Sequence, residues 1–401
     1  MQMMESLLNS KLWASPSRSK PKDWKKQDVA MGFIVGILIG LMLMSGTRYI
    51  FSAKPSATDA VQEMRQSHIG EATLSTLAKS MDNETIHVLA TSNGSPYQNI
   101  QTRIMYGSFL KVQSTPLGKQ RLKGFTRILH RTQPDNLMDE VPTFQASPLN
   151  PKCDEWCEFP VADRPDAVRQ WLDHVEEDPT TVKGTWLLML ETDYVFAKVP
   201  DLPTKISADG EVLPVSFPFH YIQPTAKHLE PIIREMYTED LGPVTDIQPT
   251  GPAPVLINIQ QLTRLILDWV RLTDHIESSP AAKEALGWRP PIVFSLDAPP
   301  ASILTVQPPN DEALGAAALY HYTWGAIISN AAGEKIWSFD KRDYTAEEHA
   351  NKPPKLQLLP PFEPGWKLQD GKIVSKELYY ILDHEITLMN EVISGLPQLS
   401  S

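Results

Sequence analysis

The sequence predicts an α/β protein built on an open, largely parallel sheet. Segments rich in β-branched apolar residues alternate along the chain with segments of helical spacing, which is the pattern of strands joined by helical crossovers. The apolar run within TWLLMLETD (185–193) is uninterrupted, as expected for a central strand buried on both faces. With 401 residues, of which 42% are hydrophobic and 21% charged, the chain is long enough for one large domain or two moderate ones.

The N-terminal segment predicts a membrane anchor. Residues 30–46 (AMGFIVGILIGLMLMSG) carry no charge and, continued to Phe51, approach the ~20 residues that span a bilayer. A cleaved signal peptide is the alternative, but its charged and apolar regions are usually shorter. Basic residues before the run predict a cytosolic N-terminus under the positive-inside rule: Arg18, Lys20, Lys22, Lys25 and Lys26. We therefore expect a type II membrane protein with a cytosolic tail at 1–29 and an anchor at 30–51.

The chain after the anchor is expected in a lumenal compartment. Residues 52–85 are polar and rich in Ala and Ser, which favours a stem; the first helix of the globular domain is the less favoured alternative. A globular domain is predicted at 86–366, followed by a C-terminal helix and tail at 367–401. The 35 prolines concentrate in the later half and predict many irregular connections there.

Two further features bear on the lumenal prediction. Asn-x-Ser/Thr triplets begin at Asn83 and Asn93 and favour a lumenal position weakly, because such triplets are common by chance. The only cysteines, Cys153 and Cys157, would form a local disulfide in an oxidising lumen or remain two free thiols; both alternatives stay open. Without nearby histidines the pair is too small for a structural zinc site.

The strands and helices of the globular domain are predicted in chain order. The first strand is IHVLAT (86–91), which feeds a loop, and an amphipathic helix follows at Asn99–Val112. The end of a second helix is expected at Trp171–Glu177, and a third helix at Gln260–Ile276. Further strands are expected at Phe125–Leu129, 185–193, Val215–Ile222, Val255–Ile259 and Leu319–Thr323. In open α/β sheets ligands bind beyond the carboxyl ends of the strands, so polar residues there are the candidate site residues.

The most specific local motif is Glu191-Thr192-Asp193, directly after the apolar strand. Two carboxylates spaced i, i+2 can point into one crevice where a strand gives way to a turn. Their hard oxygen atoms suit Mg²⁺ or Mn²⁺, which would neutralise the charge that develops on a leaving diphosphate. An ordinary solvated strand end is the alternative, because acidic residues are common there.

Other side chains are candidates for the same site. His321 lies at the polar end of the last predicted strand, and its imidazole would complete the metal site; a structural histidine flanked by two tyrosines is the alternative. Arg103 and Arg127 lie in apolar segments, so each needs an anion partner, from the protein or from a ligand. Lys341 and Arg342 would hold phosphate oxygens, unless they are a solvated basic pair. The candidates for nucleotide or phosphate contacts are thus Thr91, Arg103, Arg127, Lys341 and Arg342.

Charge and missing motifs exclude several classes of function. A net charge of −11 argues against a general nucleic-acid-binding protein, which needs clustered Lys and Arg. The sequence contains no G-x-x-x-x-G-K loop, no G-x-G-x-x-G and no G-x-S-x-G. Kinases, Rossmann dehydrogenases and α/β hydrolases therefore lose support.

Several sequence blocks resemble the hydroxyproline O-arabinosyltransferase family of plants and green algae. The longest is KGFTRILHRTQPDNLMDEVPTFQASPL (123–149). Shorter blocks stand in the family's order over roughly residues 86–361: RIMYGSF (103–109), WLLMLETDYVF (186–196), FPFHYIQP (217–224), GPVTDIQPTGPAPVLI (242–257), QPP (307–309), HYTWG (321–325) and WSFDKRDY (337–344). A long match with later blocks in register is far more specific than a lone Glu-x-Asp.

The resemblance implies a GT-A-like nucleotide-diphospho-sugar transferase fold with a mixed, mainly parallel central sheet, which makes 86–366 the glycosyltransferase domain. It implies a Golgi membrane location, UDP-arabinofuranose as donor and hydroxyproline in secreted proteins or peptides as acceptor. Glu191, Asp193 and His321 fall in matched blocks, which strengthens the hypothesis of a Mn²⁺ (or Mg²⁺) site. The family's linkage suggests retention of configuration, and we assign no general base. Phe219 and Tyr221 are candidates for the acceptor wall, because aromatic faces suit a prolyl ring; core packing explains them equally well.

One segment departs from the family pattern. After Gly287-Trp288 the family has a helix with an acidic residue and several aromatics, whereas here the chain reads RPPIVFSLDAPPASIL, shorter and broken by prolines. Asp297 is the one acidic residue that stands there. A related transferase with another UDP-sugar or a serine acceptor, and a non-catalytic lumenal protein that binds hydroxyproline-rich chains, are therefore the competing hypotheses.

Overall fold

The computed structural model describes residues 84–154, 160–207, 210–219, 221–285, 303–323 and 325–400. The predicted tail, anchor and almost all of the predicted stem lie outside these ranges. Asn83, Cys157 and the departing segment after Gly287, apart from Ile303 and Leu304, lie outside them as well. Within these ranges, none of the helices has the length and apolar character needed to cross a bilayer.

The central sheet holds six strands in the order β3-β2-β1-β4-β7-β6. Neighbouring strands from β3 to β4 are parallel, and β7 runs antiparallel to both β4 and β6. This arrangement confirms the predicted mixed, mainly parallel sheet. The strands are β1 (Ile86–Ser92), β2 (Leu122–His130), β3 (Thr143–Ala146), β4 (Trp186–Leu190), β6 (Val215–Pro218) and β7 (Thr250–Asn258).

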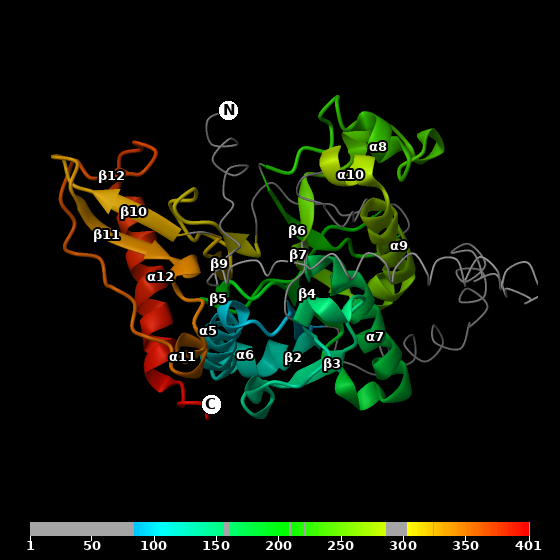
Figure 1. The fold of residues 1–401 in the computed structure, drawn as a ribbon, viewed down its shortest axis with the longest axis horizontal. Coiled ribbons are helices and arrows are strands. Elements are labelled where there is room, and N and C mark those ends of the chain that lie inside the picture. The colour runs from blue at the N-terminus through cyan, green and yellow to red at the C-terminus, as the bar shows by residue number, and fades with distance from the viewer. Residues whose placement is uncertain are drawn as a thin grey trace, which may run out of the picture. The chain divides into compact units, whose positions relative to one another are not determined.

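Helices cover both faces of this sheet (Figure 1). Leu187 and Met189 of β4 pack in one cluster with α7 and α9, whereas Leu188 and Leu190 pack in another with α5. Successive strand side chains point to opposite faces, so a central strand covered on both sides is apolar at every position, as WLLML is. The long helices are α5 (Pro96–Gln113), α7 (Arg164–Glu177), α9 (Ile259–Ser278) and α12 (Lys376–Gly395).

Local sequence sets where these helices begin. The Ser95 hydroxyl accepts a hydrogen bond from the Gln98 N–H at the start of α5, and Pro96 occupies the first turn, where its missing N–H does no harm. Asn258 and Gln261 form a capping box at the start of α9. The short helices are α6 (Pro116–Arg121), α8 (Glu230–Arg234), α10 (Pro280–Ala285) and α11 (Glu347–Asn351), with 3₁₀ turns at Asn136–Asp139, Pro151–Asp154, Pro160–Asp163, Pro179–Thr181, Glu239–Leu241, Val244–Asp246 and Lys341–Asp343.

Two small sheets lie on the α5 side of the molecule. One has the order β5-β9-β8, with β5 antiparallel to β9, and the other has the antiparallel order β11-β10-β12. Helix α12 packs with α5 and these strands in one hydrophobic cluster, so the predicted C-terminal helix shares the core of the domain. The strands are β5 (Tyr194–Phe196), β8 (Thr305–Val306), β9 (Leu319–His321), β10 (Gly325–Ser329), β11 (Lys335–Asp340) and β12 (Lys367–Leu368).

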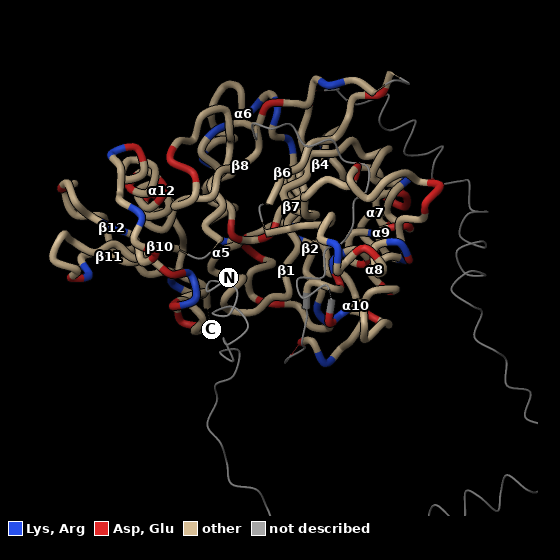
Figure 2. Tube along the Cα trace, turned by 90° about the horizontal axis from the view of Figure 1, so that it is seen from above, with Lys and Arg blue, Asp and Glu red and all other residues tan. Residues whose placement is uncertain are grey.

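Every strand and helix predicted within the globular domain and the C-terminal segment is present among the described residues, and several elements were not predicted. The sequence analysis missed β3 and took Leu319–Thr323 as the last strand, although β10, β11 and β12 follow it. It left the state of the cysteines open, and Cys153 is disulfide-bonded. In Figure 2 the Lys and Arg positions of the described residues are scattered among the Asp and Glu positions.

Candidate active site

The Glu191-Thr192-Asp193 motif occupies the turn between β4 and β5, at the carboxyl end of the central strand. The Thr192 hydroxyl donates a 2.9 Å hydrogen bond to the side-chain oxygen of Gln101 on α5. One carboxylate oxygen of Glu191 and one of Asp193 lie within 4.8 Å of each other, so the two acids face the same crevice, as their i, i+2 spacing predicts.

His321 joins the two acids because β5 and β9 pair side by side. The ladder sets Tyr194 opposite His321, and the Tyr322 N–H donates to the Asp193 carbonyl at 3.3 Å. His321 Nε2 lies 3.3 Å from Asp193 Oδ2. One possible ligand atom from each of Glu191, Asp193 and His321 falls within 4.8 Å of the others. The structure thus brings the three predicted metal ligands together.

The imidazole of His321 is held on three sides. The ring of Tyr194 stacks on it with centroids 4.4 Å apart, and the ring of Phe219 meets it edge-on at 6.1 Å. The Gln307 amide lies 3.1 Å from Nδ1, the ring nitrogen turned away from Asp193. A histidine that binds a metal through one nitrogen is usually held by a polar partner at the other, and Gln307 stands in that position.

This cluster fits a divalent cation. Asp193 Oδ1 is buried and has no hydrogen-bond partner among the described residues, which is unfavourable unless a ligand completes its coordination. Two carboxylates and an imidazole are ligands that Mn²⁺ accepts, whereas a pure oxygen set would favour Mg²⁺ or Ca²⁺. Asp193 and His321 are buried and Glu191 is half-buried, so the cluster is open on the Glu191 side.

Two cations neutralise the acids. The Lys341 ammonium pairs with Asp193, and Arg164 Nη2 donates to Glu191 Oε1 at 2.6 Å. Burial alone would raise the pKa of Asp193, but the Lys341 ammonium and His321 hold it well below its usual range. Burial would likewise lower the pKa of Lys341, but the Asp193 carboxylate raises it above its ordinary value. Both groups are therefore charged at neutral pH.

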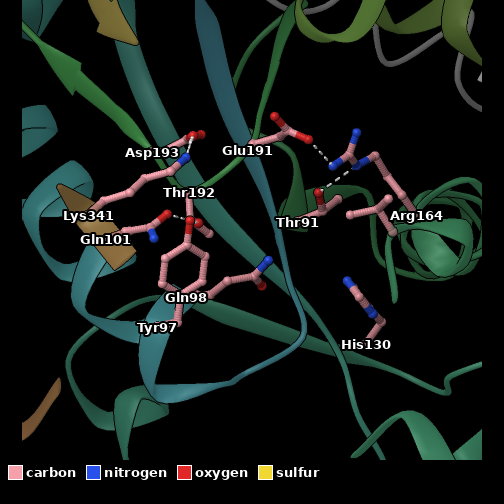
Figure 3. A pocket seen from close by; sticks show the side chains of 11 residues that line it. Thr91, Tyr97, Gln98, Gln101, His130, Arg164, Glu191, Thr192, Asp193 and Lys341 are labelled. Carbon is pink, nitrogen blue, oxygen red and sulfur yellow. Dashed lines mark hydrogen bonds and ion pairs between the residues drawn. The ribbon is translucent and has the colours of Figure 1, made fainter. Parts of the chain in front are cut away.

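The cluster opens into a polar cavity of about 130 Å³. Figure 3 shows the two ion pairs side by side at one end and His130 at the other. Arg164 Nε also donates to the Thr91 hydroxyl at 3.0 Å, which ties the ends of β1 and β4 together. The lining residues are Thr91, Tyr97, Gln98, Gln101, His130, Val161, Arg164, Glu191, Thr192, Asp193 and Lys341. The predicted contacts Thr91 and Lys341 are among them.

Arg103, Arg127 and Arg342 require a correction, because their guanidinium groups are bound by the protein outside this cavity. Arg103 pairs with Glu140 at 2.7 Å, and Arg127 with Asp135 at 2.5 Å. Arg342 is exposed and pairs with Asp340 on its own turn. The anion partners required by the two buried arginines are therefore protein carboxylates.

The two predicted acceptor residues differ from each other. Phe219 is buried against His321, and its ring lies 5.2 Å from that of Tyr221. Tyr221 remains 45% exposed, and after burial the charges of Glu191 and Asp193 raise the pKa of its phenol, so it lies near the cluster. Tyr221 is thus exposed near the cluster, whereas Phe219 is buried against His321.

Sequence analysis missed Arg164, Gln101 and His130. Arg164 begins α7 next to Pro165, and a proline at the first helical turn was the available signal that this helix starts beside the sheet edge. His130 ends β2 and lies 3.6 Å from the buried carboxylate of Asp163. No local pattern marks Gln101, whose side chain lines the cavity because the first turns of α5 begin just after the carboxyl end of β1.

Comparison with known proteins now bears on this site. A family model described as the hydroxyproline O-arabinosyltransferase family N-terminal domain matches residues 86–292. The chain is 33% identical over 331 residues to hydroxyproline O-arabinosyltransferase 1 of Arabidopsis thaliana. The aligned region covers 79% of this chain and 81% of that protein. The chain belongs to the hydroxyproline O-arabinosyltransferase family. The family model spans Glu191, Asp193 and Arg164, whereas His321 and Lys341 lie beyond its end.

Other relatives agree with this membership. Hydroxyproline O-arabinosyltransferase 3 of Arabidopsis thaliana is 36% identical over 292 residues (69% of this chain, 75% of that protein). Hydroxyproline O-arabinosyltransferase PLENTY of Lotus japonicus is 34% identical over 306 residues (71% and 77%). Among solved structures, mouse xyloside xylosyltransferase 1 has a TM-score of 0.30 at 13% identity, over 60% of this chain and 98% of that one. A glycosyltransferase of PBCV-1 capsid glycosylation also scores 0.30, at 11% identity, over 60% and 93%. These two scores carry no argument about this chain.

Proposed function

We propose that the protein transfers L-arabinofuranose from UDP-arabinofuranose to the hydroxyl of hydroxyproline in secreted proteins or peptides, on a GT-A-like fold. In the reaction the bond between the anomeric carbon and the UDP oxygen breaks, a bond from that carbon to the acceptor oxygen forms, and the hydroxyl proton is released. The observation that carries the proposal is the cluster of Glu191, Asp193 and His321 at the carboxyl end of β4, in a chain of this family.

The cluster is proposed to hold Mn²⁺, with Mg²⁺ as the alternative. A bound divalent ion neutralises diphosphate charge and so makes UDP a better leaving group. The protein's share is to fix two ligands in the β4–β5 turn and one at the end of β9: the β5–β9 ladder sets Asp193 beside His321, and Gln307 and Tyr194 hold the imidazole plane. Pre-set ligands of this kind need no reorganisation during the reaction.

The acceptor is proposed to bind on the Tyr221 side of the cluster. Tyr221 is exposed and lies near Glu191 and Asp193, so a prolyl ring packed on its face would bring its hydroxyl toward the donor. Phe219 is buried beneath and keeps both Tyr221 and His321 in position. The structure does not single out a general base, and we propose none.

The cellular location is proposed from the sequence. The predicted anchor at 30–51, whose residues 30–46 carry no charge, together with the basic residues before it, supports a single-pass type II Golgi membrane protein whose catalytic domain is lumenal. A lumenal domain is compatible with the disulfide at Cys153, because such bonds persist in oxidising compartments. Protease protection of sealed Golgi vesicles is the test: digestion of the 86–366 domain without detergent would contradict it.

The activity is tested by UDP release from UDP-arabinofuranose with a hydroxyproline-containing peptide, using the full-length protein in detergent with Mn²⁺. Asp193→Asn is expected to lower turnover by about 100-fold or more, because a metal ligand becomes neutral. Asp201→Asn is the matched control, since that carboxylate is 67% exposed and lies outside the cavity. Unchanged turnover in Asp193→Asn would remove the metal site from the mechanism.

The same assay separates the competing hypotheses. Faster UDP release from another UDP-sugar, or with a serine-rich peptide, would favour a related transferase of different specificity. Peptide binding without any metal-dependent UDP release would favour the non-catalytic protein.

A further inference from the structure

Both acids of the metal cluster are already paired with cations that line the same cavity. Arg164, from the start of α7, donates to Glu191 at 2.6 Å, and Lys341, from the end of β11, pairs with Asp193. In Figure 3 the two cations approach the acids from opposite sides. A divalent ion that takes Glu191 and Asp193 as ligands must therefore displace or weaken two existing ion pairs.

Arg164 is bound by fewer protein acceptors than Arg103, a buried structural arginine. Arg103 donates from Nε and both terminal nitrogens to Glu140 and three backbone carbonyls. Arg164 donates to described residues from Nε and Nη2 only, and Glu191 is 37% exposed. A guanidinium has five N–H donors, so Arg164 retains donor capacity beside the cavity.

Charge balance decides what would bind here. The ligand-free site contains two carboxylates, one ammonium and one guanidinium, whose formal charges cancel. A divalent ion alone would leave the site with excess positive charge, and a diphosphate alone would leave it with excess negative charge. Together they restore the balance, which matters in a buried site where charges are weakly screened.

We propose that Arg164 and Lys341, which pair with the metal-binding carboxylates, bind the diphosphate once a divalent ion has taken those carboxylates as ligands. The divalent ion and the nucleoside diphosphate would therefore bind cooperatively. When the ion occupies the carboxylates, the guanidinium and the ammonium become available to the phosphate oxygens, which they bind well. This inference rests on the metal site and the donor class of the proposed function.

The test measures Mn²⁺ affinity of the full-length protein in detergent, by the electron paramagnetic resonance signal of free Mn²⁺, with and without UDP. In the wild type UDP is expected to tighten Mn²⁺ binding by about tenfold or more. In Arg164→Met and Lys341→Met, Mn²⁺ alone is expected to bind more tightly than in the wild type, because one competing cation is gone. The logarithm of the factor by which UDP raises Mn²⁺ affinity is expected to fall by about half or more in each variant, because a phosphate ligand has been removed as well.

Matched variants control for the loss of one positive charge. The control for Arg164→Met is Arg169→Met, because Arg169 is also on α7 and, among the described residues, pairs only with acids of that helix. The control for Lys341→Met is Lys335→Met, because Lys335 is exposed at the start of β11. Both are expected to leave Mn²⁺ affinity and the UDP enhancement unchanged. If Lys341→Met fails to fold because Asp193 loses its buried partner, Arg164→Met decides alone, since its partner is partly solvated.

Two results would be distinguishable. If UDP raised Mn²⁺ affinity as much in Arg164→Met as in the wild type, while Asp193→Asn bound Mn²⁺ more weakly, the proposed diphosphate role of Arg164 would be overturned and the metal site would be supported. Unchanged Mn²⁺ binding in Asp193→Asn would overturn the metal site and the inference with it.

Discussion

Buried arginines occupy two different settings in this molecule. Beside α5, Arg103 is enclosed by Glu140 and by the backbone carbonyls of Ala350, Asn351 and Pro397. At the carboxyl ends of β1 and β4, Arg164 has one carboxylate and one hydroxyl and faces a cavity. In the first setting the protein satisfies the cation completely. In the second setting some N–H donors remain for a ligand. The number of protein acceptors around a guanidinium therefore distinguishes a structural arginine from one that binds a ligand.

The largest expected effect would come from breaking the enclosed pair. Arg103→Met leaves the Glu140 carboxylate, which is 12% exposed, without its cation, and is expected to lower the free energy of unfolding by about 3–5 kcal/mol. Arg164→Met is expected to lower it by less than about 1 kcal/mol, because Glu191 can be hydrated. Urea denaturation of the two variants checks this; equal losses would erase the distinction between the settings.

A buried acid of α12 sharpens the contrast with Asp193. Glu385 is buried with no ion pair among the described residues, and burial raises its pKa from 4.5 to about 8, whereas Asp193 stays ionised beside Lys341. Because the Glu385 carboxyl has a higher pKa in the folded state than in the unfolded state, its protonation favours folding. That contribution to stability is complete below pH 4.5 and is lost as the pH rises to about 8.

The Glu385→Gln variant measures that contribution, because glutamine resembles the protonated acid and does not titrate. Relative to the variant, wild-type stability is expected to fall by up to about 1.4 kcal/mol per pH unit between pH 5 and 8, a total of a few kcal/mol. Unfolding curves at several pH values test this. Parallel pH profiles for the two proteins would mean that Glu385 is charged or paired in the fold.

An intermediate effect is expected behind the metal ligands. Gln307→Leu removes the amide beside Nδ1 of His321 while retaining bulk, and is expected to weaken Mn²⁺ binding by about tenfold or more. Gln307→Glu, which places a carboxylate acceptor beside Nδ1 where the wild type has the amide nitrogen, is expected to recover much of the affinity, because metal-binding histidines commonly donate to a carboxylate. Equal Mn²⁺ affinity in the leucine variant and the wild type would show that the aromatic neighbours alone orient the ring.

The smallest effect is expected from a cation with no buried partner. Arg169 forms i,i+3 and i,i+4 pairs with Asp166 and Asp173 on α7. Arg169→Met is expected to change the free energy of unfolding by no more than about 0.5 kcal/mol, because surface pairs contribute little. A loss comparable to that of Arg103→Met would show that ion pairing on this helix supports the fold.

Sequence reasoning found those features whose signal is local. An apolar run identified β4, and the acids that follow it lie where the end of a central strand places them. The approach of His321 to Asp193 depends on the pairing of β5 with β9, which no local pattern records; it was expected because both residues fall in blocks that resemble the family.

The errors have the same origin. An arginine in an apolar segment looks alike in sequence whether its partner is Glu140, Asp135 or a phosphate, because the partner lies outside that segment, 37 residues from Arg103 and eight from Arg127. Strands β10 to β12 were missed because exposed positions interrupt their apolar residues, and because β12 spans only Lys367–Leu368.

The position of His321, the third proposed metal ligand, depends on the register in which β5 and β9 pair, and not on the length of the chain between these strands. Tyr194 stands opposite His321, so an insertion or deletion in the sequence that connects Phe196 to Leu319 would leave the histidine in place if the strands still paired as they do. Shifting β9 by one residue would instead turn a tyrosine toward Asp193 and the imidazole to the opposite face. Length changes around the proline-broken segment after Gly287 are therefore compatible with an unaltered ligand set.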